Sequence, residues 1–504
     1  MAVIPDSPTT LPPAAEAGVP TVEVSCLEKG TQEINAVPDE LLVTFSNPPN
    51  TPPTNPLDWS PHRKTFTALL TSISGLITLM AGPMMAPALG AVARDLHISE
   101  AKANMSLSIY ILAWAFGPMV LGPCSEVWGR RPICVIGGVW YVIWNTVAGL
   151  SNGGELLILS RLMAGLGASA EYAVSGPIVA DIYSSDERGK SQIIRGALPL
   201  LGPAIGPLVA GVMVQHSSWR WMFHVLSIMN TIVVLLIIFF LPETHAPTLL
   251  KSKASRLRKA TGKAYCTKHE SNDVTLGKRL KIALVRPMKM LATHPTIQLI
   301  ALVMGYQFGV LYIAHATFAS VWTEHYNQSP TASGLHYFAI VIGCLAGLYG
   351  GGKAMDRIWA HLKEKNNGRT SPENRIPLLI PGMVMIPAGL IWYGWAAEKG
   401  VHWIVPDIGI AIFGGGHMVS NTAMGAYVVE SFLDHTASAG AASQFPKNIF
   451  AFVFPIFAPS LFNTLGYGMG NTILAIISVV LSIPSICILR KYGQKLRDIG
   501  NKNM

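Results

Sequence analysis

Long apolar stretches alternate with short polar segments along most of the chain. Six apolar stretches fall in the first half, near residues 65–88, 105–123, 133–150, 155–181, 196–215 and 219–241. Six more fall near residues 296–322, 331–350, 375–397, 402–430, 436–462 and 470–490. A membrane-spanning helix needs about 20 mainly apolar residues, a length that each of the stretches at 219–241 and 296–320 reaches with almost no charge. The pattern therefore predicts an all-α membrane protein with about 12 transmembrane helices.

The polar segments divide the chain into five regions. Residues 1–64 are rich in Pro, Thr and acidic side chains, so we expect a disordered cytosolic tail that lacks a cleavable signal peptide. A first six-helix bundle is expected at 65–241, a cytosolic central loop at 242–295, a second six-helix bundle at 296–490 and a cytosolic C-terminal tail at 491–504. Related halves of this kind are a common design for transporters with a central cavity.

Composition and charge support this interpretation. Hydrophobic residues make up 50% of the 504 residues and charged residues 13%, against roughly 25% charged in soluble domains. If both termini are cytosolic, most Lys and Arg residues lie on the cytosolic side, which is the usual bias of membrane proteins. The formal charge of +9 then reflects orientation in the membrane, and nucleic-acid binding is not expected. The 6 cysteines show no metal-type spacing and are interpreted as packing residues.

Three motifs carry the functional information. Residues 122–132 read Gly-Pro-Cys-Ser-Glu-Val-Trp-Gly-Arg-Arg-Pro, residues 161–168 read Arg-Leu-Met-Ala-Gly-Leu-Gly-Ala, and residues 198–211 read Leu-Pro-Leu-Leu-Gly-Pro-Ala-Ile-Gly-Pro-Leu-Val-Ala-Gly. With these motifs, the chain from about Asn55 to Arg497 resembles the major facilitator superfamily. Within it, the chain is similar to the fungal twelve-span drug:proton antiporters, which include relatives of polyamine exporters and secondary-metabolite efflux pumps. The resemblance implies the major facilitator fold.

The first motif resembles the superfamily's gating signature. Its glycines, Gly122 and Gly129, permit a tight turn, while Glu126, Arg130 and Arg131 can form ion pairs that hold one conformation. The resemblance further implies that Asp181 pairs with Arg130, unless Asp181 is an ordinary helix-end carboxylate. In the second half, Asp356 holds the position that corresponds to Glu126.

The second motif introduces a charge into an apolar stretch. The resemblance associates Arg161 with proton coupling, although an Arg near the membrane boundary can also extend to water. Glu171 lies ten residues further along the same predicted helix, about 15 Å away at 1.5 Å per residue, so the two side chains cannot pair directly. At that depth Glu171 is a candidate proton or cation site, and the alternative is a hydrogen-bonded structural residue.

The third motif resembles the fifth-span signature of antiporters, which points to export. Its Gly and Pro residues allow kinking and close helix packing. They are Gly202, Pro203, Gly206, Pro207 and Gly211. Ile193 and Ala210 replace glycines of the family pattern. Gly and Pro are also generally common in membrane helices, which is the alternative explanation.

Other polar residues in the apolar stretches are candidates for the central cavity. His315 and His417 could titrate near neutral pH or serve as neutral hydrogen-bonding groups. Tyr306, Gln307 and Asn421 could bind a largely apolar ligand or simply pack.

The sequence therefore predicts a proton-coupled efflux pump for a small organic molecule, such as a secondary metabolite, toxin or drug. Its expected partners are protons, the substrate and the lipid bilayer. We expect a functional monomer in the plasma membrane, or alternatively in the vacuolar membrane. Residues 188–191 lack the upstream glycine of a phosphate-binding loop, and neither an enzyme site nor a metal or cofactor site is expected. An importer of the same fold and a non-transporting membrane receptor remain as alternatives.

Overall fold

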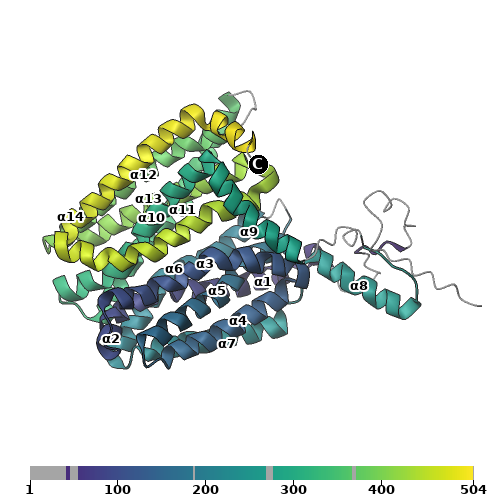
Figure 1. Cartoon of the computed structure of the whole chain (residues 1–504), viewed down its shortest axis with the longest axis horizontal. Helices are drawn as coiled ribbons and strands as arrows, with labels where there is room; N and C mark the ends of the chain where they lie inside the picture. The colour runs from purple at the N-terminus through teal and green to yellow at the C-terminus, as the bar shows by residue number, and fades with distance from the viewer. Residues whose placement is uncertain (1–40, 46–54, 185–187, 268–275, 366–370, 503–504) are drawn as a thin grey trace, which may run out of the picture. The chain divides into compact units, whose positions relative to one another are not determined.

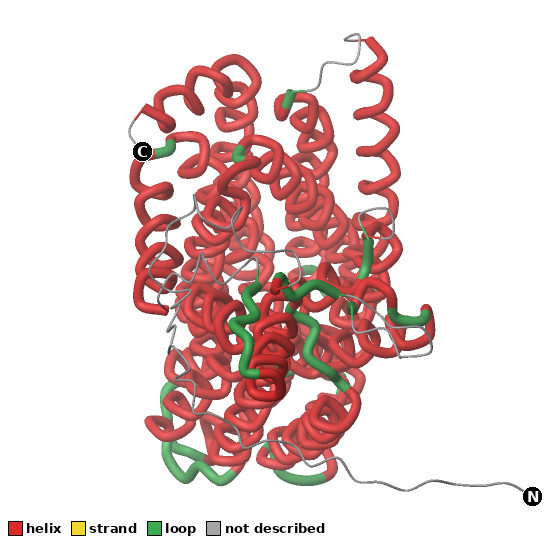
Figure 2. The backbone as a smooth tube through the Cα atoms, turned by 90° about the vertical axis from the view of Figure 1, so that its right-hand side faces the viewer, coloured by secondary structure: helices red, strands yellow, loops and turns green. Residues whose placement is uncertain are grey.

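The computed structural model describes residues 41–45, 55–184, 188–267, 276–365 and 371–502. Within these ranges helices account for nearly all of the chain, and the only β-type pairing is an isolated bridge between Leu42 and Cys266. Figure 2 shows that most helices are joined by short loops.

The chain separates into two compact units, and the larger comprises residues 46–249 and 274–504. Its first group of helices is α1 (Pro61–Met80), η4 (Pro83–Ala88), α2 (Leu89–Asp95), α3 (Glu100–Trp128), α4 (Arg130–Gly149), α5 (Gly154–Ile182), α6 (Arg188–His216) and α7 (Arg220–Phe240). Its second group is α10 (Pro295–Ser320), α11 (Pro330–Lys365), α12 (Leu379–Glu398), α13 (Ile404–Ser431) and α14 (Thr436–Lys502). Between the groups lies α9 (Leu276–Thr293).

The number of long helical segments agrees with the twelve predicted spans. By length and composition, nine segments of the described residues could cross a membrane. The helices α5 and α13, with 29 and 28 residues, are also long enough to span a membrane. The helix α14 is bent at Gly466, whose φ of 74° is non-helical, so it forms two helices.

Each group packs into its own bundle (Figure 1). In the first, α5 contacts α3 and α4, α6 contacts α1, and α7 contacts α4. In the second, α10 and α12 contact α14, and α13 contacts α11 and α12. Two helix pairs, α6 with α11 and α3 with α14, form the main contacts between the bundles. The predicted pair of helical bundles is therefore present.

Two ends of the larger unit are distinguished by their loops. One, here called the Gly129 end, holds the α3–α4 junction and the start of α14. The opposite end, the Gly466 end, holds the α4–α5 loop and the bend of α14.

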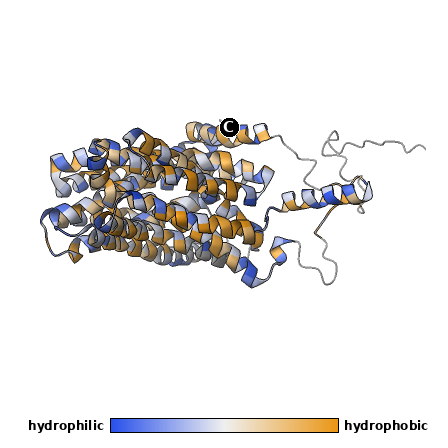
Figure 3. Cartoon of the chain, turned by 90° about the horizontal axis from the view of Figure 1, so that it is seen from below, coloured by the Kyte–Doolittle hydropathy of each residue, from blue (hydrophilic) through white to orange (hydrophobic). Residues whose placement is uncertain are grey.

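Large apolar side chains cover the outside of the bundles. On α7, for example, Ile232, Phe239 and Phe240 are exposed, and Phe239 is 77% exposed. Figure 3 shows hydrophobic residues along the long helices and hydrophilic residues on α8 (Ala246–Thr261). An apolar surface of this extent is stable in contact with lipid and not with water.

The stretch at 242–295, predicted as a central loop, contains the two helices α8 and α9. Most of α8 belongs to the smaller compact unit, in which Val43 packs against Leu250 and Ala254. Within the larger unit, α9 contacts α3 and α14.

Candidate functional site

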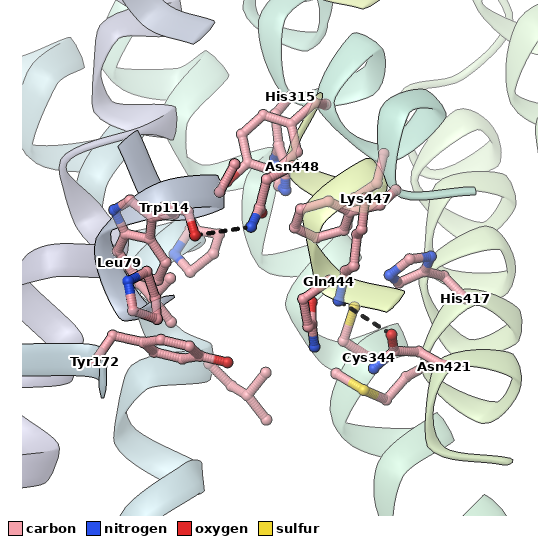
Figure 4. A pocket seen from close by; sticks show the side chains of 18 of the residues that line it. Leu79, Trp114, Tyr172, His315, Cys344, His417, Asn421, Gln444, Lys447 and Asn448 are labelled. Carbon is pink, nitrogen blue, oxygen red and sulfur yellow. Dashed lines mark hydrogen bonds between the residues drawn. The ribbon is translucent and has the colours of Figure 1, made fainter. Parts of the chain in front are cut away.

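A cavity of about 580 Å³ lies inside the larger unit, between the two bundles. Its walls come from α1, α3, α5 and α6 of the first bundle and α10, α11, α13 and α14 of the second. This volume is in the range of sites that bind drug-sized molecules. Figure 4 shows side chains of both bundles pointing into the space.

Aromatic rings form much of the cavity wall. On the first bundle, the rings of Trp114 and Tyr172 lie 4.9 Å apart between centroids. On the second, Phe308 lies 5.0 Å from Tyr312 and stacks with His417 at 6.0 Å. Such walls bind apolar and aromatic molecules through area burial and ring contacts.

The polar part of the wall comes mainly from α14. Lys447 and Asn448 follow Gln444 by three and four residues, which places both beside Gln444 on one side of the helix. The Nζ atom of Lys447 donates a hydrogen bond to Oδ1 of Asn421 at 3.1 Å. The amide of Asn448 donates to the backbone carbonyl of Trp114 at 3.1 Å and so connects the two bundles.

Three of the predicted cavity residues line this space: His315, His417 and Asn421. Both histidines are buried, and the Nδ1 atom of each has no hydrogen-bond partner among the described residues. The ring of His315 stacks nearly parallel to that of Tyr337, at 6.1 Å between centroids. An incoming ligand could therefore satisfy these ring nitrogens.

Tyr306 and Gln307 do not line the cavity. The hydroxyl of Tyr306 donates to the carbonyl of Leu474 at 2.7 Å, which joins α10 to α14. Gln307 is buried, and its Nε2 atom has no hydrogen-bond partner among the described residues. In this conformation both residues contribute to packing of the second bundle.

Arg161 is fully buried outside the cavity lining. Its guanidinium donates to the carbonyl oxygens of Ser106, at 3.1 Å, and Ala81, at 2.8 Å, and lies 4.5 Å from the Tyr110 ring centroid. The Ala81 carbonyl follows the last residue of α1, where carbonyls lack partners within the helix. Arg161 therefore stabilises the break between α1 and η4 and does not extend to water.

Glu171 is also separate from the cavity. It is 3% exposed and faces Ser74 of α1, Asn230 of α7 and Gly138 of α4, so it lies in the interior of the first bundle. Neither carboxylate oxygen has a well-formed hydrogen bond among the described residues. Its neighbour Tyr172 faces the cavity instead.

The gating signature forms a charged cluster at the Gly129 end. The predicted pair between Arg130 and Asp181 is present, with Nε and Oδ2 3.3 Å apart, and Nη1 of Arg130 donates to the Ser125 hydroxyl at 2.6 Å. Glu126 pairs with Arg279 of α9 at 3.3 Å. The side chain of Asp356 lies outside the described residues.

Glu243 also belongs to this cluster, although it was not among the predicted gating residues. Its carboxylate accepts hydrogen bonds from the backbone N–H groups of Arg130, at 2.9 Å, and Arg131, at 3.2 Å, at the start of α4. Side chains that cap helix starts in this way usually lie just before the helix in sequence. Because Glu243 lies more than 100 residues from Arg130 in the chain, no local sequence pattern indicates this contact. Gly129 has a φ of 100°, and a Cβ there would lie 2.3 Å from Oε2 of Glu243.

The third motif packs α6 closely against two other helices. A Cβ at Gly202 would lie 2.9 Å from the Met80 nitrogen, and one at Gly206 would lie 2.7 Å from the Met80 carbonyl oxygen, both in α1. A Cβ at Gly211 would lie 2.3 Å from the carbonyl oxygen of Pro330, at the start of α11. Pro203 lines the cavity, and the Pro207 carbonyl contacts Gly334. The motif thus joins α6 to its own bundle and to the opposite one.

Known proteins match this chain over most of its length. The family model described as Major Facilitator Superfamily matches residues 71–455. A protein of Aspergillus flavus named "Probable efflux pump mfs2" is 39% identical, over 82% of this chain and 98% of its own length. "Efflux pump vrtL" of Penicillium aethiopicum is 37% identical, over 95% of this chain and 96% of its own length.

Among solved structures, the partially occluded inward-open conformation of the xylose transporter XylE from E. coli matches with a TM-score of 0.60. The match covers 85% of this chain and 99% of XylE at 16% sequence identity, so the likeness concerns the fold.

Proposed function

Because this chain belongs to the Major Facilitator Superfamily and is a membrane transporter rather than an enzyme, we propose that it exports a small organic molecule in exchange for protons. The observation that carries the proposal is the cavity of about 580 Å³ with walls from both bundles. A site shared between two bundles can open first to one side of the membrane and then to the other as the bundles rock. Export agrees with the names of the fungal relatives, which are called efflux pumps. The proposed cargo is a secondary metabolite, toxin or drug.

The contacts between the bundles support alternating access. At the Gly466 end, α6 and α11 touch through backbone atoms, because Gly211 meets Pro330 and Gly334 meets Leu208. Near the cavity, the rings of Phe116 and Phe445 lie 5.2 Å apart and join α3 to α14. Contacts made by small residues and single ring pairs can separate without leaving many polar groups unpaired.

Proton coupling is assigned in this proposal to Glu171. A carboxylate buried within the span of a membrane protein usually has a function, because its charge is costly there. Loss or gain of a proton would change the charge between α1, α4, α5 and α7. Tyr172 is the next residue of α5 and contacts Trp114 in the cavity wall, so a shift of α5 would reach the substrate site directly. Arg161 would keep the break between α1 and η4 in place during this movement.

The proposed orientation places the Gly129 end, both termini and the basic helices α8 and α9 in the cytosol. The plasma membrane is the proposed location, with the protein acting as a monomer.

The test measures efflux from yeast cells that express the full chain. The cells are preloaded with a panel of small organic compounds, and efflux is measured with and without a protonophore. Cells with comparable amounts of the Glu171→Gln variant at the surface provide the comparison. The proposal expects protonophore-sensitive loss of at least one compound. Protonophore-sensitive uptake would instead identify an importer, and absence of any flux at normal surface abundance would favour a receptor.

A further inference from the structure

The ionisable side chains around the cavity have an unequal distribution of charge. The described residues that line it include Arg195, His315, His417 and Lys447 but no Asp or Glu. Arg195 lies on α6 of the first bundle and Lys447 on α14 of the second, so both bundles contribute a cationic group. Glu171 directly precedes the cavity residue Tyr172 in sequence, but its carboxylate faces away from this space. The electrostatic field inside the cavity therefore favours negative charge.

The surroundings of Lys447 indicate which charge a ligand in the cavity would carry. The residue is only 8% exposed, and its Nζ lies 4.3 Å from the Phe308 ring centroid and 3.1 Å from Oδ1 of Asn421. Within the described part of the chain, Asn421 is the hydrogen-bond acceptor of Lys447 and no carboxylate pairs with it. An ammonium group has three donors, so two remain for another acceptor. Burying an ammonium without a counter-ion is costly, which a negatively charged ligand would offset.

The other residues of the cavity wall indicate the shape and polarity of such a ligand. Trp114 and Tyr172 form an aromatic wall opposite Lys447 and Asn421 (Figure 4). Phe308 and Tyr312 add a second pair of rings beside Lys447. These surfaces favour a flat, apolar or aromatic body, with one acidic group at the Lys447 side.

We propose that the substrate is an aromatic or largely apolar organic anion, such as a carboxylic acid or an acidic phenol, whose acidic group binds Lys447 in the central cavity. This inference rests on the proposed function in treating the cavity as the transport site. An organic cation of the same size would meet the charge of Lys447 at close range and would be disfavoured. The structure thus assigns a class of substrate that the general drug-export function leaves open.

The test uses three fluorescent probes with one ring system: anthracene-2-carboxylate, its neutral carboxamide and the cationic 2-(aminomethyl)anthracene. Binding to the purified full chain in phosphatidylcholine nanodiscs is measured by fluorescence anisotropy, with empty nanodiscs as the correction for partitioning. We expect the carboxylate to bind at least about tenfold more tightly than the carboxamide, since a charge-assisted hydrogen bond is worth that much or more. The amine should bind no more tightly than the carboxamide.

Variants of Lys447 locate the preference. Lys447→Gln should weaken carboxylate binding by about tenfold and leave carboxamide binding unchanged, whereas Lys447→Arg should largely preserve the carboxylate preference. Lys399→Gln makes the same substitution at an exposed position directly after the end of α12 and should change none of the three affinities. Unchanged carboxamide binding also shows that the Lys447→Gln protein is folded.

Four results would overturn the inference: tightest binding of the amine, no binding of the carboxylate, an unchanged carboxylate preference in Lys447→Gln, or equal loss of all probes in that variant. Binding requires no proton gradient, so this test is independent of efflux. A chain that binds the carboxylate but exports nothing would contradict the proposed function alone. A chain that exports cations in a protonophore-sensitive manner without preferring the carboxylate would contradict only the substrate class.

Discussion

Glu171 and Tyr172 are neighbours in α5, yet their side chains leave the helix toward different parts of the molecule. Tyr172 faces the cavity, and Glu171 faces Ser74 and Asn230 inside the first bundle. A residue that binds protons at this position need not touch the substrate, because Glu171 and the cavity residue Tyr172 are consecutive in the same helix. The coupling proposed here therefore depends on a single side chain with a carboxyl group.

Replacing Glu171 with Gln should reduce protonophore-sensitive efflux at least about tenfold, because an amide keeps the size of the side chain but cannot exchange a proton. Glu155→Gln is the matched control at the start of the same helix, where the side chain is 85% exposed and pairs with Lys102. Efflux is measured at equal surface abundance of each variant. Normal efflux by Glu171→Gln would exclude Glu171 as the coupling site.

At this scale the sequence identified some cavity residues and missed others. On α10, Phe308, Leu311, Tyr312 and His315 line the cavity at helical spacing, while Tyr306 and Gln307 lie on other faces. The helix is apolar and buried on nearly all sides, so the sequence carries no signal for which face points inward. Lys447 and Arg195 were recognisable only as charges in apolar stretches, and their shared position depends on how the bundles meet.

At the scale of single elements, α6 is held by backbone contacts. Gly202 and Gly206 both approach the Met80 backbone in α1, which cannot move aside as a side chain could. The sequence shows a pattern of Gly and Pro residues at 198–211. In this conformation its glycines allow close packing of α6. The approximate positions of the long helices were also readable from the sequence, because the apolar stretches are long. Their ends were not, since α11 continues to Lys365 and α14 to Lys502, beyond the predicted ends at 350 and 490.

Gly206→Ala should lower the free energy of unfolding by about 1–3 kcal/mol, because a Cβ at this position would lie 2.7 Å from the Met80 carbonyl oxygen. Gly196→Ala on the same helix has no atom within 4 Å of its added Cβ and should be neutral or stabilising, as Ala favours helix by about 1 kcal/mol. Thermal unfolding of the two purified variants in the same detergent measures the difference. Equal melting temperatures would contradict the packing role of Gly206.

At the scale of the whole molecule, the two bundles are in contact at the Gly466 end through α6 and α11. The sequence predicted two bundles because a polar segment separates two sets of six apolar stretches. It could not predict at which end the bundles are in contact, since the same residues serve every conformation of a transport cycle. The contact of Gly211 with Pro330 identifies one of the places that must separate.

Gly211→Leu should prevent this contact and favour a conformation that is open at the Gly466 end, because even a Cβ would lie 2.3 Å from the Pro330 carbonyl oxygen. The native Cys344 in the cavity wall reports the change. With a membrane-impermeant maleimide added outside intact cells, labelling of Cys344 should rise at least about threefold, as expected for a shifted population.

Gly350→Leu is the control for this change, since Gly350 lies on α11 and a Cβ there meets no atom within 4 Å. Cys344→Ser in the Gly211→Leu background should remove the added label. Labelling that stays at the wild-type rate would show that the Gly211 contact does not govern access to the cavity from that side.

The contact of glycine with backbone between α6 and its neighbours also bears on how such a protein can diversify. Close approach along α6 uses backbone atoms at Gly202, Gly206 and Gly211, whereas the cavity is defined by side chains such as Phe308 and Lys447. Side chains of the cavity wall can be replaced without changing these backbone contacts between the helices. A change of substrate can therefore leave the contacts of α6 with α1 and α11 unaltered.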